Sequence, residues 1–279
     1  MKSQLKWIII RLLAIVPDRL YIIVQHHFHL GFFPDLKNPK TMSEYFMVLK
    51  LKKNVRELIK YTHKVQAKQW ITSKIGEQWV VPTLLSKETL SQEDLKSLPL
   101  PFIIKPTLGS QHNFIINSYQ EIDHLILKHV PHYLLYRERN YEGTPGWIVE
   151  PMLDDLSQVQ DYKALCFNGR VETIQVSLNN HEKSRCMLNR EGEVIHYPFA
   201  SGREDHFELT YLDKLPEMIR VSEILAEPFE FVRIDFMCSP HGIKISELTF
   251  FPQGGYSLRK DKSMNQTWLS YFIKEKKYD

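Results

Sequence analysis

Two adjacent segments near the C-terminus constrain the fold more than any other part of the chain. Residues 231–239 (FVRIDFMCS) and 243–250 (IKISELTF) alternate between apolar and polar side chains, as β-strands with one buried face do. In the loop 240–242 (PHG), proline presets the first turn residue and glycine takes the left-handed position. This predicts an antiparallel hairpin with a three-residue loop, in which Ser239 faces Ile243.

This register sets the partners of the charged side chains. Asp235 comes to lie opposite Glu247, and Arg233 opposite Thr249, all on one face of the hairpin. The other face is apolar and predicts a core face, with Val232, Ile234, Phe236, Leu248 and Phe250. Directly opposed carboxylates lie about 5 Å apart at Cβ and repel each other. Either one of them is protonated, or a cation lies between them.

Two cations fit this requirement. Mg²⁺ prefers hard oxygen ligands, and its sites in proteins usually combine one or two carboxylates with phosphate oxygens. The alternative is the guanidinium of Arg233, which would neutralise Asp235 and Glu247 as part of a surface charge network. The hairpin alone leaves both alternatives open.

The chain as a whole predicts an α+β protein. Helical patterns fill the first 60 residues, mixed helices and strands follow, and an antiparallel sheet with helices comes last. The 279 residues are enough for two domains or one elaborated unit. The net charge is +3, and the basic residues are interspersed with acidic ones. No nucleic-acid-binding motif is present, so we expect no nucleic-acid partner. The three cysteines have neither metal-site nor disulfide spacing, which predicts a reducing cytoplasm.

The N-terminal sequence, MKSQLKWIIIRLLAIVP, is basic and apolar, as a signal peptide is. Arg11 interrupts the apolar run, no small-residue cleavage site follows, and the run is too short to span a bilayer. We expect a helix that packs on the body of the protein. The alternative is a peripheral helix on the inner face of the membrane, with Lys2, Lys6 and Arg11 facing anionic headgroups.

Polar residues also stand where the apolar segment FIIKP ends. Lys105 emerges at the end of this predicted strand, beside the polar loop TLGSQHN. In that loop, Gly109 lets backbone amides approach a ligand and Ser110 can donate to a phosphate. A surface lysine before an ordinary hairpin loop is the alternative.

Other charged residues also have both a functional and a purely structural interpretation. Glu150 ends the strand WIVE, where an exposed backbone edge suits an adenine ring, or where a carboxylate caps a turn. Asp161 and Lys163 lie two apart on one strand and so share a face, which suits phosphate or ribose contact or a surface ion pair. Lys64 lies on a predicted helix and indicates nothing by itself.

In their order along the chain, these motifs resemble the ATP-grasp superfamily. HKVQAKQWI is similar to its DKxxx[KR] helix, LPFIIKP to its phosphate-binding strand, and VRIDFM with ISELTFFPQGG to its metal-binding core. LKNPKTMSEYFMVLKL, EQWVVPTLL, RERNYEGTPGWIVEPML and DYKALCFNG resemble the TupA-like branch in particular. The resemblance covers nearly the whole chain. It implies two α+β lobes that grip ATP: a helical N-terminal segment at 1–60, a lid lobe at 61–146, and a C-terminal lobe with the antiparallel sheet and metal site at 147–279.

The resemblance also implies roles for individual residues. Those that would bind ATP are Lys64, Lys105, Gly109 and Ser110 for the phosphates, Glu150 and Leu153 for adenine, and Asp161 for the ribose. Those that would hold Mg²⁺ are Asp235, Glu247 and Thr249. The remaining ones would act on the substrate: Lys163 near the γ-phosphate, Arg233 at the tetrahedral centre, and Gly254, Gly255 and Arg259 in substrate binding.

Three positions depart from the family pattern. His63 replaces an aspartate before the helix lysine, and Tyr45 stands where the branch commonly has a lysine. Thr249 replaces the asparagine that most ATP-grasp enzymes use as third metal ligand, although threonine is common in this branch. Because a hydroxyl is a poorer metal ligand than an amide carbonyl, the number of bound Mg²⁺ ions, one or two, remains open.

The function implied is that of an ATP-dependent carboxylate–amine ligase that works through an acyl phosphate. The TupA-like branch points to the attachment of an amino acid or amine to a uronic acid or polysaccharide during cell-envelope biosynthesis. Two alternatives have other chemistry: an ATP-dependent sugar or polysaccharide kinase on the same fold, and a nucleotide-binding module without catalysis. The opposed carboxylates argue against the last.

Overall fold

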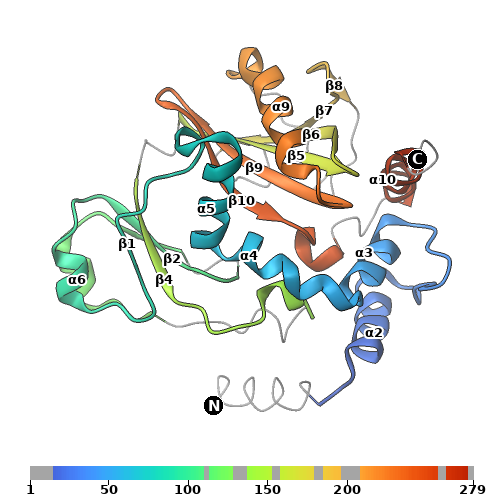
Figure 1. Ribbon diagram of the computed structural model, residues 1–279, viewed down its shortest axis with the longest axis horizontal. Helices are drawn as coiled ribbons and strands as arrows, with labels where there is room; N and C mark the ends of the chain where they lie inside the picture. Colours follow the sequence, from blue (N-terminus) through green and yellow to red (C-terminus); the bar gives the residue numbers. More distant parts are fainter. Residues whose placement is uncertain are drawn as a thin grey trace.

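The structure is a computed structural model that describes residues 15–109, 113–127, 137–152, 158–178, 185–195, 208–256 and 262–275. Within these ranges the chain forms two antiparallel β-sheets, with helices from both ends of the chain beside them (Figure 1). The predicted N-terminal helix falls almost entirely outside the described residues. None of the described helices is long and apolar enough to cross a membrane.

Helices form the first part of the described chain, as predicted. Their bounds are α2 Asp18–Leu30, α3 Met42–Lys50, η1 Lys53–Leu58, α4 Ile59–Thr62, α5 Lys64–Ile75 and η2 Glu77–Trp79. The start of α3 is capped as its sequence predicts, because the side chain of Thr41 accepts from the backbone N–H of Glu44. The Glu44 carboxylate in turn accepts from the N–H groups of Asp35 and Lys40, at 2.9 and 2.8 Å.

The smaller sheet has four strands in the order β1-β4-β2-β3. Its elements are β1 Leu85–Lys87, α6 Gln92–Lys96, β2 Phe102–Pro106, β3 Phe114–Ile116, α7 Tyr119–Asp123 and β4 Trp147–Pro151. It has a core of its own, which includes Phe102, Ile104 and Val149. Since β4 pairs with both β1 and β2, this sheet extends to Pro151. The predicted lobe boundary between residues 146 and 147 would cut it and has to move beyond β4.

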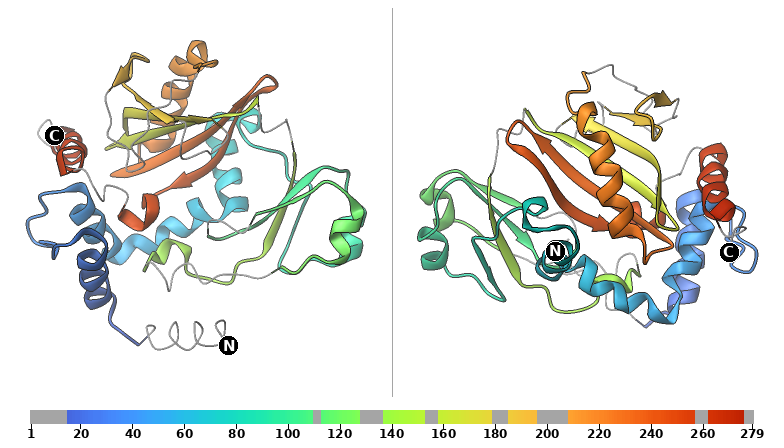
Figure 2. Two further views of the ribbon diagram at one scale, coloured as in Figure 1. Left: turned by 180° about the vertical axis from the view of Figure 1, so that it is seen from behind. Right: turned by 45° about the horizontal axis from the view of Figure 1, so that its top comes forward.

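The larger sheet has six strands in the order β10-β9-β5-β6-β7-β8. Its strands are β5 Gln160–Phe167, β6 Arg170–Leu178, β7 Arg185–Leu188, β8 Val194–Ile195, β9 Phe231–Ser239 and β10 Gly242–Thr249. Helix α9 (Leu215–Ala226) lies across β5, β6 and β9, and α10 (Lys262–Glu275) packs beside α3 (Figure 2). Short 3₁₀ turns complete the described chain: η3 Arg139–Tyr141, η5 Leu212–Lys214 and η6 Pro252–Gly255.

The N-terminal helices share the core of the larger sheet. Phe46 of α3 packs edge-on against Phe231 of β9, with ring centroids 4.9 Å apart. Ile71 of α5 is buried in the same core, and α5 contacts α9 and β10. Helix α5 therefore packs with the C-terminal lobe, although the predicted division of the chain assigned it to the lid lobe. Packing across the sequence, and not position along it, decides where this helix belongs.

The hairpin of β9 and β10 differs from its prediction at the turn and agrees with it at the charges. Ser239 pairs with Gly242 and not with Ile243, so the loop has two residues. A β-bulge at Ser246 then adds one residue to β10. This bulge restores the predicted register, so Asp235 faces Glu247 and Arg233 faces Thr249.

Candidate active site

Three neighbouring strands of the larger sheet bring charged side chains into one row. β5 pairs with β9 so that Lys163 lies opposite Asp235, and β9 pairs with β10 so that Asp235 lies opposite Glu247. Paired residues of adjacent strands share a face, so these three side chains project from the same face of the sheet. Asp161, two residues before Lys163 on β5, lies on this face as well. The predicted opposition of the two carboxylates is confirmed.

Arg233 links the acidic pair. Its guanidinium binds Asp235 through two hydrogen bonds, from Nε to Oδ1 and from Nη2 to Oδ2, both 2.6 Å long. Nη2 also lies 3.6 Å from Oε1 of Glu247 and donates to the hydroxyl of Thr249 at 3.3 Å. That hydroxyl donates to Glu247 at 3.2 Å. Arg233 thus neutralises part of the charge of the pair, as the second alternative required, although Asp235 is buried and only Glu247 is partly exposed.

The two carboxylates have opposite pKa shifts. Burial raises the pKa of Asp235, whose side chain is 6% exposed, and Arg233 and Lys163 only partly oppose this. Burial also raises the pKa of Glu247, but the positive charges of Arg233, Lys64 and Lys163 outweigh it and hold the pKa below its usual value. The side chain of Glu247 is 37% exposed. Glu247 is therefore an ionised carboxylate that a ligand can reach.

The residues at this site fit a magnesium ion. Asp235 and Glu247 supply hard oxygen donors, and each carboxylate oxygen of Asp235 that accepts from Arg233 keeps a second lone pair. The hydroxyl of Thr249 both donates and accepts, which leaves it one lone pair. Among the described residues, no group of three or more His, Cys, Asp and Glu side chains could hold a metal. An ion here would need oxygen ligands from a phosphate or water, as Mg²⁺ commonly has.

A second charge cluster faces this row from α5 and the smaller sheet. It consists of three lysines around one carboxylate: Lys64, Lys68, Lys105 and Glu150. Nζ of Lys105 lies 2.6 Å from Glu150, and Lys68 forms a second ion pair with the same carboxylate. The side chain of Glu150 is only 5% exposed. One carboxylate cannot neutralise three cations, so the lysine cluster has an excess of positive charge that suits a polyphosphate.

Lys64 joins the lysine cluster to the acidic pair. Its backbone N–H donates to the carbonyl of Thr107, and its Nζ donates to the carbonyl of Gly109, both at 2.8 Å. Gly109 has a φ of 97°, which a glycine adopts without strain. Burial lowers the pKa of Lys64 to about 8, against the attraction of Glu247. A polyphosphate held by the lysines would therefore lie beside a metal held by Asp235 and Glu247.

Comparison with known proteins identifies the family. Residues 44–273 match the model of a protein family described as "TupA-like ATPgrasp". The chain belongs to the TupA-like ATP-grasp family. The α+β ATP-grasp fold expected from the sequence is thereby confirmed.

Solved structures similar to this TupA-like ATP-grasp protein include two ligases. For D-alanine–D-alanine ligase from Helicobacter pylori, identity is 12% over 74% of this chain and 59% of that chain, with a TM-score of 0.44. For the ATP-grasp ligase PsnB in complex with precursor peptide PsnA2 and AMPPNP, identity is 11% over 84% of this chain and 65% of that chain, with a TM-score of 0.44. The chain spans less than two thirds of the length of either ligase. No curated protein matches it.

Five predicted site residues are not placed in these clusters. Gly254 and Gly255 are buried beneath α3, and the N–H of Gly254 donates to the carbonyl of Phe251 at 2.9 Å. The structure thus gives this glycine pair a packing role, and its contact with a substrate stays a prediction. The predictions for Ser110, Leu153 and Arg259 fall outside the described residues.

Two lysines of this TupA-like ATP-grasp protein went unassigned in the sequence. Lys68 is the last residue of the KVQAK motif, and its spacing of four from Lys64 on a helix could have indicated a shared face. Lys50 is 1% exposed, and its Nζ donates to the carbonyl of Gly254 at 2.5 Å. Its position at the start of a lysine-rich run, LKLKK, made it indistinguishable from a surface lysine.

A substitution of Glu150 can distinguish a role in adenine binding from a role as the counter-charge of the lysines. The resemblance assigns it to adenine, whereas its carboxylate binds Lys68 and Lys105. We expect Glu150→Gln to lower the unfolding free energy by about 2 kcal/mol, because the partly buried Lys68 and Lys105 lose their counter-charge. The stabilisation by ATP should then increase, since phosphates replace that charge. Thermal unfolding with and without ATP measures both effects.

The matched control is Glu142→Gln, which removes a carboxylate that pairs with Arg56 and Arg139 at a more exposed position, 33% for the side chain. It should change stability by about 1 kcal/mol or less. If Glu150→Gln instead weakened the stabilisation by ATP, the adenine contact would be the better assignment.

Proposed function

We propose that this protein is an ATP-dependent carboxylate–amine ligase. The observation that supports this best is the junction at Lys64 of two charge clusters, one acidic and suited to a metal, the other basic and suited to a polyphosphate. A nucleotide whose phosphates lie on the lysines has its terminal phosphate beside Asp235 and Glu247. Family membership supports the same chemistry.

The reaction has two steps. An oxygen of the substrate carboxylate attacks the γ-phosphorus of ATP, the bond from that phosphorus to the β,γ-bridging oxygen breaks, and ADP leaves. The amine nitrogen then attacks the carbonyl carbon of the acyl phosphate. Inorganic phosphate leaves with the bonding electron pair, and the nitrogen loses a proton to water. The products are an amide, ADP and phosphate.

The chain contributes mainly position and charge to these steps. Asp235 and Glu247, with Thr249, would hold Mg²⁺, which supplies neutralisation of phosphate charge when bound. Lys64 and Lys105 hold the phosphates of ATP, and Lys163 adds positive charge near the terminal one.

The remaining roles concern the acceptor and the adenosine. Arg233 stabilises the negative charge that develops at the tetrahedral centre of the second step. Gly254, Gly255 and Arg259 contact the acceptor, and Asp161 contacts the ribose.

We further propose the class of substrates. The acid is an acidic sugar or polysaccharide with a uronic-acid carboxylate, and the amine is an amino acid or other amine. This rests on the resemblance of the sequence motifs to the TupA-like branch, which implies a role in the assembly of cell-envelope polysaccharides. A cytoplasmic location belongs to the same proposal, because ATP is used there and all three cysteines are free thiols.

The experiment is a screen of acid and amine pairs for ADP and phosphate release. Release that requires both substrates, together with a product whose mass is that of the acid plus the amine less one water, is the expected result. Each acid alone and each amine alone serve as controls. Transfer of phosphate onto a sugar hydroxyl would establish a kinase instead. The absence of ADP in every mixture, together with an ATP-induced rise in melting temperature, would leave a nucleotide-binding module without catalysis.

A further inference from the structure

Exposed apolar side chains gather on helix α2 and the segments beside it. Five of the twelve large apolar side chains that are exposed in the described chain lie between residues 15 and 33, so one short region holds a disproportionate share. Three of them, Leu20, Val24 and Phe28, are spaced four residues apart on α2 and are 55%, 52% and 78% exposed. Residues at this spacing lie on one face of a helix. We refer to these three residues as the α2 stripe.

The opposite side of α2 is well packed. Tyr21, Ile22 and His26 are buried against the body of the protein, and Nδ1 of His26 lies 3.0 Å from the carbonyl of Phe32. Helix α2 is therefore held firmly in place with its stripe outward, at an edge of the molecule away from both sheets (Figure 1). An exposed apolar row on an anchored helix indicates a binding surface.

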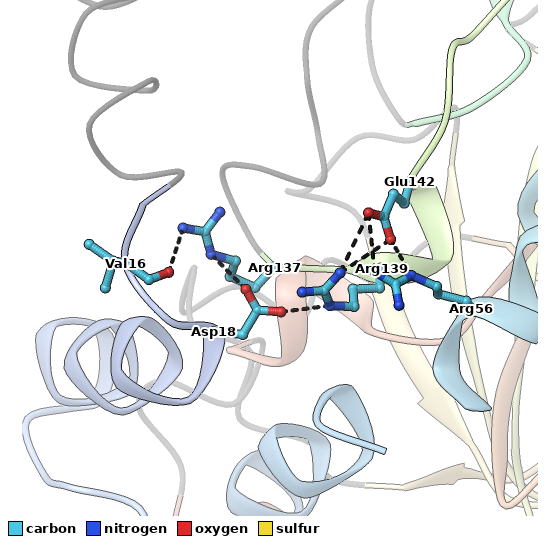
Figure 3. Close-up of polar contacts among 6 residues, drawn as sticks. All are labelled: Val16, Asp18, Arg56, Arg137, Arg139 and Glu142. Carbon is cyan, nitrogen blue, oxygen red and sulfur yellow. Dashed lines mark hydrogen bonds and ion pairs between the residues drawn. The ribbon is translucent and has the colours of Figure 1, made fainter. Parts of the chain in front are cut away.

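The only acid of α2 is turned away from the stripe. Asp18 binds Arg139, whose Nε donates to Oδ2 at 2.7 Å, and Nε of Arg137 lies 3.3 Å from Oδ1 (Figure 3). Nη2 of Arg137 also donates to the carbonyl of Val16 at 3.4 Å. Arg139 also forms an ion pair with Glu142, which in turn pairs with Arg56 (Figure 3). This network neutralises Asp18 on the inner side of the helix.

The outer face of α2 consequently combines apolar residues with positive charge. Arg19 and His27 are exposed beside the α2 stripe, and no carboxylate of the helix accompanies them. A helix with an apolar face, a flanking arginine and no exposed acid suits the boundary between the headgroups and acyl chains of anionic lipids. A second copy of this chain fits less well, because a two-fold contact through the α2 stripe would bring the Arg19 side chains of the two copies toward each other.

We infer that the α2 stripe binds the surface of an anionic lipid membrane, with Leu20, Val24 and Phe28 inserted at the headgroup boundary. Arg19 attracts the lipid phosphates and the apolar residues supply the insertion. This contact is separate from the ATP site and does not depend on the proposed ligase activity. It would hold the protein where membrane-attached acceptors are found.

Cosedimentation of the full-length chain with lipid vesicles tests this inference. We expect binding to vesicles that contain phosphatidylglycerol and much weaker binding to vesicles of phosphatidylcholine alone. The double variant Val24→Glu/Phe28→Glu should bind the anionic vesicles at least about ten-fold more weakly, because two apolar side chains that insert into the membrane are replaced by charged ones. It leaves residues 1–14 intact, so a contribution of that segment would persist.

The matched control is Ile224→Glu/Ile273→Glu, which adds the same two charges at exposed positions on α9 and α10. It should bind as the wild type does. A milder variant, Arg19→Gln, keeps the α2 stripe and should weaken binding to the anionic vesicles alone. Far-ultraviolet circular dichroism checks that each variant is folded.

Three results would overturn the inference. The first is a wild type that binds neither vesicle, or both equally. The second is an equal loss of binding in the two double variants. The third is a wild type that sediments as a dimer in the absence of lipid and becomes monomeric in Val24→Glu/Phe28→Glu, which would assign the stripe to a second copy of this chain.

Discussion

Glu247→Gln is expected to abolish ATP turnover while the protein stays folded. Glu247 is the more accessible carboxylate of the opposed pair, and Arg233, Lys64 and Lys163 hold its pKa below the usual value. An amide lacks the negative charge that a metal ion and these cations require. We expect a loss of about a thousand-fold in the rate of ADP formation, which corresponds to about 4 kcal/mol of transition-state stabilisation.

Stability should change far less than activity in this variant. With a side chain 37% exposed, Glu247 contributes about 1 kcal/mol or less to folding through its ion pairs. The matched control is Glu230→Gln, whose side chain is 36% exposed and pairs with Lys52. This control should keep its turnover. Wild-type activity in Glu247→Gln would contradict the metal site, and chelation of divalent cations should reproduce the loss in the unaltered protein.

Gly255→Ala should destabilise the protein by about 3 kcal/mol. Gly255 has a φ of 81°, where an L-residue costs roughly 1–2 kcal/mol. A Cβ there would lie 2.8 Å from Cε of Met47 and 3.0 Å from Cβ of Phe46, so α3 would have to move. Such overpacking typically adds about 1–3 kcal/mol. The melting temperature should fall by roughly 5–10 °C.

Gly31→Ala provides the control for this prediction. Gly31 has nearly the same φ, 85°, but a Cβ there would meet nothing within 4 Å. It should therefore show the backbone effect alone, about 1 kcal/mol. The difference between the two variants measures how closely α3 packs on the turn that follows Thr249. Equal losses in both would show that this contact contributes nothing.

The hairpin of β9 and β10 shows where prediction from local sequence succeeds and where it stops. Alternation determines which residues share a face, because a slip by one residue would place Glu247 among the apolar side chains. The turn was predicted wrongly, since a two-residue loop with a bulge at Ser246 and a three-residue loop without one give the same register at Asp235 and Glu247. Local sequence cannot distinguish them, because both satisfy the apolar pattern.

The lysine cluster could be predicted only in part. Lys64 and Lys105 were assigned through the resemblance, and the structure places both of them in the cluster with Glu150. Lys68 was missed, although it lies one helical turn from Lys64 on α5. The role of Lys50 had no signal at all, since its burial follows from the contact of α3 with a turn that is 204 residues away in the sequence.

The amino-acid sequence by itself determined the α+β class, the family, the strands near the C-terminus and the pairing of Asp235 with Glu247. Each of these depends on patterns within short segments, whose periodicity and turn residues are local properties. The tertiary structure alone decided that α5 packs with the larger sheet, that β4 belongs to the smaller one, and that Arg233 binds Asp235 in a buried ion pair. These outcomes depend on which surfaces meet, and burial between distant segments is a property of the whole packed chain.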